Sequence, residues 1–172
     1  MTVNVAVLGA GSWGTILANL LVENGHHVEL WGNDPEKVAE INEQHTNKHY
    51  LPEFKIDPRL HATLDLNEAF EAVDVVLFVI PTQVIRQVAA QIVPVLEAKG
   101  VKPVIVTASK GLEQGSHKRI SEALTETIPA DVRNGIVVLS GPSHAEDVAM
   151  KDITTLTAAS TDLVQVQWIQ EI

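Results

Sequence analysis

The chain has 172 residues, of which 45% are hydrophobic and 20% charged, a balance typical of a globular domain rather than of a disordered one. The formal net charge of −10 argues against broad binding to nucleic acids or to anionic membranes. Cysteine is absent, no apolar run reaches membrane-spanning length and the N-terminus has no basic signal-peptide region, so we expect a cytoplasmic protein without disulfides, thiolate metal sites or membrane insertion.

The chain begins with apolar runs that alternate with segments of helical periodicity. Val3–Leu8 is mostly apolar, which predicts a strand buried on both faces, and Ser12–Asn24 carries apolar residues at helical spacing. His27–Trp31 alternates polar and apolar residues and predicts a second strand. A second helix is expected to begin at Asp34-Pro35. Residues 45–58 are polar and irregular, and such an excursion can cover a ligand.

Strands and helices continue to alternate after residue 66. The expected strands are Val73–Ile80, Val104–Ala108, Ile136–Ser140 and Ile153–Ala159. The expected helices are Asn67–Ala72, Thr82–Lys99, Ser116–Thr127 and Ser143–Met150, the second of which Pro94 should kink or shorten. Short strands joined by helices run parallel through right-handed crossovers, so we predict an α/β fold with a doubly wound, mostly parallel sheet.

The end of the chain differs from the rest in what it offers for packing. Thr161 or Asp162 caps a last helix that runs to Ile172. Trp168 and Ile169 lie in this helix and need an apolar surface. We therefore expect residues 1–160 to form one domain, and residues 161–172 to begin the connection to a further domain that this chain lacks.

Residues 9–14, Gly-Ala-Gly-Ser-Trp-Gly, fit the pattern G-x-G-x-x-G between a predicted strand and a predicted helix. Gly9 permits the tight turn, Gly11 leaves room for a pyrophosphate and Gly14 lets the helix pack closely against the strand. The N-terminus of the helix offers N–H groups and a positive dipole end to phosphates. A glycine-rich turn without a ligand is the alternative, but the context favours a Rossmann-like dinucleotide-binding fold.

The end of the second strand should lie near the adenosine ribose of such a ligand. An acid there favours NAD by bonding the ribose 2′-hydroxyl, whereas an arginine favours NADP. Asp34 has the right spacing but is also a good N-cap, and Asn33 is neutral and suits either cofactor. No arginine occurs nearby, so the sequence leaves NAD versus NADP open.

Three later segments and the glycine loop together carry a resemblance that spans the chain. The segments are Val79-Ile80-Pro81-Thr82, Ala108-Ser109-Lys110-Gly111-Leu112-Glu113 and Leu139-Ser140-Gly141-Pro142-Ser143-His144-Ala145-Glu146-Asp147-Val148-Ala149. In this order they closely resemble the bacterial NAD(P)-dependent glycerol-3-phosphate dehydrogenases. The resemblance implies the cofactor-binding domain of an enzyme that uses NAD(P)H to interconvert dihydroxyacetone phosphate and sn-glycerol 3-phosphate, a supplier of phospholipid precursors.

The motif and the resemblance together assign the site residues. Contacts to the dinucleotide are expected from Gly9, Gly11, Ser12, Trp13, Gly14, Asn33, Tyr50, Lys110 and Ala145. Contacts to the substrate are expected from Lys110, Gly141 and Ser143. The family places its main proton-exchanging lysine in a helical second domain, and the full-length protein is implied to be a homodimer. We therefore expect this chain to bind dinucleotide but to turn over little or no substrate alone. His144 departs from the family, which often has phenylalanine there.

The rules for parallel sheets independently place these segments together. Pro81-Thr82, Ser109-Lys110 and the segment 141–143 each follow a predicted strand, so they should gather at the carboxyl edge of the sheet. Lys110 leaves an apolar strand and is expected to be partly desolvated, where its ammonium can bind an anion or polarise a carbonyl. The alternatives are an ordinary surface lysine at 110 and a plain turn with Ser143 as an N-cap.

Other functions stay open at this point. Another β-hydroxyacid or ketoacid reductase could share the fold, and a non-catalytic dinucleotide-sensing module is the alternative from a different class. His45 and His49 are four residues apart, but they lie in a loop without further ligands, so no metal site is expected. Ser143 lacks the partners of a Ser-His-Asp triad, which argues against hydrolysis.

Overall fold

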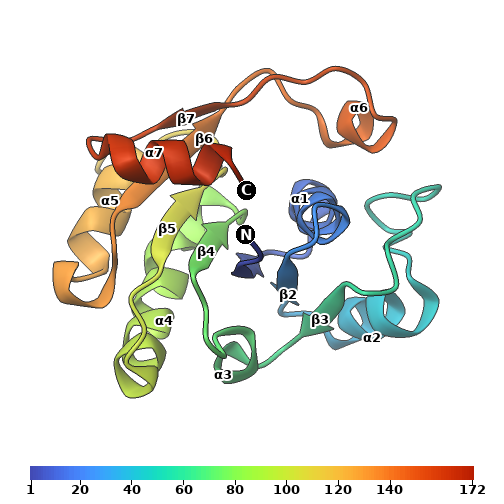
Figure 1. The fold of residues 1–172 in the computed structure, drawn as a ribbon, viewed down its shortest axis with the longest axis horizontal. Helices are drawn as coiled ribbons and strands as arrows, with labels where there is room; N and C mark the ends of the chain where they lie inside the picture. The colour runs from blue at the N-terminus through green and yellow to red at the C-terminus, as the bar shows by residue number, and fades with distance from the viewer.

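The computed structural model describes all 172 residues, which form one seven-stranded sheet with helices on both faces (Figure 1). The strands are β1 (Asn4–Leu8), β2 (His27–Trp31), β3 (His61–Thr63), β4 (Val75–Phe78), β5 (Val104–Thr107), β6 (Ile136–Ser140) and β7 (Thr157–Ala159). Their order in the sheet is β3-β2-β1-β4-β5-β6-β7, and every pair is parallel except β6 with β7. The predicted doubly wound, mostly parallel sheet is confirmed.

Seven α-helices connect or follow these strands. They are α1 (Ser12–Glu23), α2 (Pro35–Gln44), α3 (Leu66–Ala69), α4 (Ile85–Lys99), α5 (Ile120–Thr127), α6 (Ala145–Ala149) and α7 (Leu163–Gln170), with 3-10 turns at Thr82–Val84 and Ala130–Val132. None of the helices combines the length and the apolar character that crossing a bilayer requires.

The core lies on both faces of the sheet, as the apolar strands predict. Val5 and Val7 of β1 belong to one buried cluster, whereas Ala6 and Leu8 belong to the other. Side chains of α1, α2 and α7 pack against the first cluster, and side chains of α3, α4 and α5 complete the second. Successive side chains of a strand point to opposite faces, so a central strand covered by helices on both sides must be apolar throughout.

Three helices begin later than the sequence predicts, and the first is the helix predicted from Thr82, which starts as a 3-10 turn and becomes α-helical only at Ile85. The helix predicted from Ser116 begins only at Ile120, because the backbone before it adopts positive φ at Gly111 (106°), Gly115 (85°) and His117 (56°). The helix predicted from Ser143 begins at Ala145 and has His144 at its N-cap. Ser143 is therefore not the N-cap, and that interpretation is wrong.

Helix α4 ends at Lys99, as the sequence predicts. It continues through Pro94 to Lys99, so the proline does not shorten it. Proline removes one backbone donor from the helix, but Val88, Ile92 and Leu96 remain buried against the sheet. Burial of this apolar face outweighs the loss of one hydrogen bond.

The last helix packs on the same core as the rest of the chain. Asp162 is its N-cap, since the carboxylate accepts hydrogen bonds from the amides of Val164 (3.0 Å) and Gln165 (3.4 Å). Trp168 and Ile169 pack against the first core cluster, which supplies the apolar surface that this pair needs. The connection of residues 161–172 to a further domain stays a prediction.

Candidate functional site

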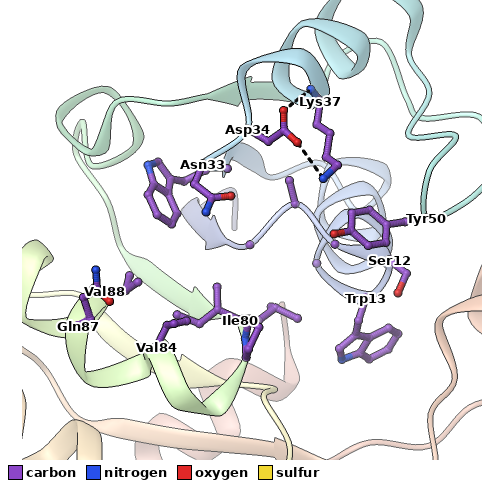
Figure 2. A pocket seen from close by; sticks show the side chains of 18 of the residues that line it. Ser12, Trp13, Asn33, Asp34, Lys37, Tyr50, Ile80, Val84, Gln87 and Val88 are labelled. Carbon is purple, nitrogen blue, oxygen red and sulfur yellow. Dashed lines mark hydrogen bonds and ion pairs between the residues drawn. The ribbon is translucent and has the colours of Figure 1, made fainter.

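A cavity of about 860 Å³ opens at the carboxyl ends of β1, β2 and β4 (Figure 2). Its walls come from the glycine loop, the residues that follow β2, Tyr50, the segment 79–81 and α4. Here β1 leads to α1 on one face of the sheet, and β4 leads to α4 on the other. Open α/β sheets bind ligands at such a switch point, and the volume is that of a cofactor site.

The three fixed positions of the G-x-G-x-x-G pattern, Gly9, Gly11 and Gly14, are glycine for different structural reasons. Gly9 has a φ of 122°, and a Cβ there would lie 2.4 Å from the carbonyl oxygen of Val79. A Cβ on Gly14 would lie 1.8 Å from the carbonyl oxygen of Gly9. A Cβ on Gly11, which lines the cavity, would meet no atom within 4 Å. The fold requires the first and third glycines, whereas the second keeps the cavity open beside the backbone.

The N-terminus of α1 is arranged to receive an anion. Gly11 is its N-cap and has no side chain to accept from the first-turn amides, and this first turn carries no acid. In contrast, α2 is capped by Asp34 and has Glu36 in its first turn. The orphan amides of α1 are therefore left for a ligand, and the helix dipole favours negative charge at this end. Ser12 and Trp13, on the same turn, line the cavity as predicted.

The opposite wall holds the charged groups of the cavity. Asp34 and Lys37 form an ion pair with 2.9 Å between Oδ2 and Nζ, and Lys37 Nζ lies 5.0 Å from the centroid of the Tyr50 ring. The hydrogen bond from Lys37 lowers the pKa of the Asp34 carboxyl, and the same bond raises the pKa of Lys37. Asn33 and Tyr50 also line the cavity, as predicted, but sequence reasoning missed Lys37. The one feature of the sequence that could have indicated Lys37 is its position one helical turn after a capping acid.

The segment 45–58 is fastened to the glycine loop through Asn47, a second residue that sequence reasoning missed. Asn47 is fully buried, and its Nδ2 donates hydrogen bonds to the carbonyl oxygen of Ala10 and to Oγ1 of Thr15, both at 3.0 Å. The backbone carbonyl oxygen of Asn47 accepts from the backbone amide of Tyr50 at 3.1 Å. Asn47 therefore fixes where Tyr50 stands relative to the glycine loop.

Lys110 lies at the same edge of the sheet but outside the lining of this cavity. Its Nζ donates to the carbonyl oxygen of Ser143 at 3.0 Å, and its own carbonyl oxygen accepts from Oγ1 of Thr82 at 2.7 Å. The segments after β4, β5 and β6 are thus brought together, as the parallel topology predicts. As a residue Lys110 is exposed, but the hydrogen bond from its ammonium to the buried Ser143 is part-buried, so the expected partial desolvation of the ammonium stays a prediction.

The three predicted site residues that follow β6, Ser143, Gly141 and Ala145, differ in their surroundings. Ser143 is buried, and its Oγ has no hydrogen-bond partner in the structure. Gly141 has a structural reason to be glycine, because a Cβ there would lie 2.4 Å from the carbonyl oxygen of Thr155. Ala145 does not line the cavity but packs in a small cluster with Leu51, against which Trp13 of the cavity wall also packs, and its contact with a cofactor stays a prediction.

An ion-pair network holds the segment that carries Lys110. Arg86 of α4 binds Glu113 through two hydrogen bonds, Nε to Oε1 at 2.5 Å and Nη2 to Oε2 at 3.0 Å, and Glu126 of α5 at 2.8 Å. The bonds from Arg86 lower the pKa of Glu113. Glu113 is therefore a structural partner of Arg86, and this pair anchors the turn between β5 and α5.

Comparisons with known proteins agree with one another. The family model "NAD-dependent glycerol-3-phosphate dehydrogenase N-terminus" matches residues 4–165. A glycerol-3-phosphate dehydrogenase (NAD(P)+) of Latilactobacillus sakei subsp. sakei is 96% identical, and one of Pediococcus pentosaceus is 59% identical; each match covers 100% of this chain and 51% of the relative. The chain thus spans about half the length of these curated relatives. A solved glycerol-3-phosphate dehydrogenase from Coxiella burnetii superposes with a TM-score of 0.87 at 32% identity, covering 99% of this chain and 50% of that one.

Proposed function

Because this chain belongs to the NAD-dependent glycerol-3-phosphate dehydrogenase family, we propose that it is the dinucleotide-binding domain of an enzyme that interconverts dihydroxyacetone phosphate and sn-glycerol 3-phosphate. The observation that carries the proposal is the uncapped N-terminus of α1 beside Gly11, at the switch point of the sheet. A pyrophosphate needs close approach to backbone amides, and this corner offers it.

The proposed cofactor is NAD(P)H. Gly11, Ser12 and Trp13 are proposed to contact the pyrophosphate and its neighbours, and Asn33 and Tyr50 the adenosine end. All five line the cavity. When bound, the nicotinamide supplies the hydride that reduces the ketone of dihydroxyacetone phosphate.

Lys110, Gly141 and Ser143 are proposed to form the substrate side. Lys110 is an exposed residue, and its ammonium can neutralise negative charge on the substrate oxygen or phosphate. The hydroxyl of Ser143 has no partner of its own and can donate to a substrate oxygen. The main proton-exchanging lysine is expected outside this chain, so residues 1–172 should orient reactants without completing the reaction.

The longer protein is proposed to add a second domain and to form a homodimer in the cytoplasm, where its product serves phospholipid synthesis. The length of the curated relatives supports a further domain. Met150, Ile153, Leu163 and Val164 are exposed apolar residues, which supports packing of that domain near α6 and α7. Light scattering of the longer protein tests the dimer.

Calorimetric titration of the 172-residue chain with NADH and with NADPH, paired with an assay on dihydroxyacetone phosphate, tests the proposal. We expect dinucleotide binding with little or no turnover, and turnover from the longer protein. If the folded chain binds neither nucleotide, the proposed function is wrong. Full activity from residues 1–172 alone would overturn the two-domain part of the proposal.

A further inference from the structure

The charge of the cavity comes from two side chains only. Among the residues that line it, Asp34 is the one acid and Lys37 the one cation. Both follow β2, and Figure 2 shows them above Asn33 and beside Tyr50, away from Val84 of the 3-10 turn and Gln87 of α4. This pair therefore decides how the adenosine end of the cavity responds to charge.

The carboxylate of Asp34 is held in place by two kinds of contact. Its Oδ1 accepts from the backbone amides of Glu36 (3.1 Å) and Lys37 (3.4 Å), and its Oδ2 lies 2.9 Å from Lys37 Nζ. Since the cap fixes the carboxylate to the backbone, the lysine is the mobile member of the pair. Rotation of its side chain can move the ammonium without disturbing the start of α2.

Lys37 already stands at the wall of the cavity. Its side chain is 24% exposed, and Nζ lies 5.0 Å from the centroid of the Tyr50 ring. A cation over an aromatic face is attracted to it, so the ring gives the ammonium a second favourable contact. The hydrogen bond that Lys37 donates to Asp34 raises the pKa of Lys37, so the ammonium stays charged at neutral pH.

In a doubly wound sheet, the adenosine ribose lies at the end of the second strand once the pyrophosphate occupies the glycine loop. The ribose 2′-hydroxyl can donate to a carboxylate such as Asp34. A 2′-phosphate would be repelled by the same carboxylate unless a cation stood between them. Lys37 is one helical turn from Asp34, so it is placed for that task.

We propose that Lys37 is the residue that admits dinucleotides with a 2′-phosphate, and that its ion pair with Asp34 lets the same cavity accept dinucleotides without one. This inference rests on the proposed function, because it assumes that the cavity binds a dinucleotide. With a 2′-hydroxyl, Asp34 accepts its hydrogen bond and Lys37 remains on the carboxylate. With a 2′-phosphate, the ammonium of Lys37 pairs with the phosphate.

The test is calorimetric titration of the chain and its variants with NADH, NADPH, 5′-AMP and 2′,5′-ADP. The nucleoside phosphates probe the adenosine end alone. For Lys37→Gln we expect NADPH and 2′,5′-ADP to bind about ten-fold or more weakly than they bind to the wild type. The affinities for NADH and 5′-AMP should change less than about three-fold. The reason is that only the ligands with a 2′-phosphate lose a hydrogen bond between two charged groups. Lys37→Arg should restore NADPH binding.

The matched control is Lys102→Gln, which removes the same charge from an exposed lysine that precedes β5 at the opposite end of the strands. It should leave both dinucleotides unchanged, and thermal unfolding should show that each variant is folded. Loss of NADH and NADPH binding in equal measure from Lys37→Gln overturns the inference, as does a wild-type chain that binds NADH but not NADPH. A wild-type chain that binds neither overturns the proposed function instead.

Discussion

Alanine at Gly11 and alanine at Gly14 test the glycine loop in two different ways, because an added methyl group meets different surroundings at the two positions. At Gly14 the new Cβ would lie 1.8 Å from the carbonyl oxygen of Gly9 and 3.0 Å from its carbonyl carbon, and both are backbone atoms. At Gly11 it would meet nothing within 4 Å, and the φ of −82° suits any residue.

The two substitutions should therefore differ in their effect on stability. For Gly14→Ala the contact must lengthen from 1.8 Å to at least 3.0 Å, so the turn and α1 must separate by at least 1.2 Å. Such overpacking against backbone costs about 3 kcal/mol, which lowers the melting temperature of a domain of this size by roughly 6–12 °C. Gly11→Ala should change the free energy of unfolding by less than about 0.5 kcal/mol.

The order should be the opposite for cofactor affinity, which Gly11→Ala should lower although it leaves stability nearly unchanged. The methyl group at Gly11 stands where a pyrophosphate must approach, so contacts between amides and phosphate are lost. Two charge-assisted hydrogen bonds correspond to about 3 kcal/mol, or a loss of roughly 100-fold in affinity for NADH. Circular dichroism melts and calorimetry measure the two quantities. If Gly11→Ala binds NADH as tightly as the wild type, the assignment of the pyrophosphate to this corner is wrong.

Three further predictions follow from contacts around the site. Asn47→Ala leaves one buried and one part-buried acceptor without their donor, so urea titration should show a loss of about 1–3 kcal/mol in the free energy of unfolding. Hydrogen bonds from Arg59 lower the pKa of Asp57 to about 2, so the stability from this pair is present above pH 4 and is lost as the pH falls toward 2. The difference in melting temperature between wild type and Asp57→Asn should shrink across that range, and a constant difference would contradict the argument. Arg86→Met releases the turn that carries Lys110, so hydrogen exchange should accelerate in residues 110–118 and not in α1.

The sequence predicts the sheet well because its signals are local. Apolar runs such as Val104–Ala108 can be satisfied only by strands covered on both faces, and the glycine pattern fixes the first turn. The segment 111–119 was predicted less well, because positive φ at His117 is set by the turn around Glu113 and Arg86 rather than by helical periodicity.

The site was predicted only where a residue belongs to a motif. Lys37 was missed because a lysine three residues after a capping acid is common, and its place at the cavity wall beside Tyr50 depends on the fold. Asn47 escaped for the same reason, since its bond partners lie 32 and 37 residues away in the chain. The exposure of Lys110 as a residue was not predictable, because burial of a strand says little about the side chain that follows it.

The placement of charge in the cavity explains how so acidic a chain can bind an anionic dinucleotide. The chain carries a net charge of −10, but at physiological ionic strength exposed charges more than about 8 Å apart are largely screened. The groups within the cavity therefore decide, and there Asp34 and Lys37 cancel each other. What remains is the dipole end and the free amides of α1, whose first turn, unlike that of α2, has neither a capping side chain nor an acid. The backbone amides of α1 thus bind the pyrophosphate by attraction at short range, and the Asp34–Lys37 ion pair distinguishes dinucleotides with a 2′-phosphate from those without one.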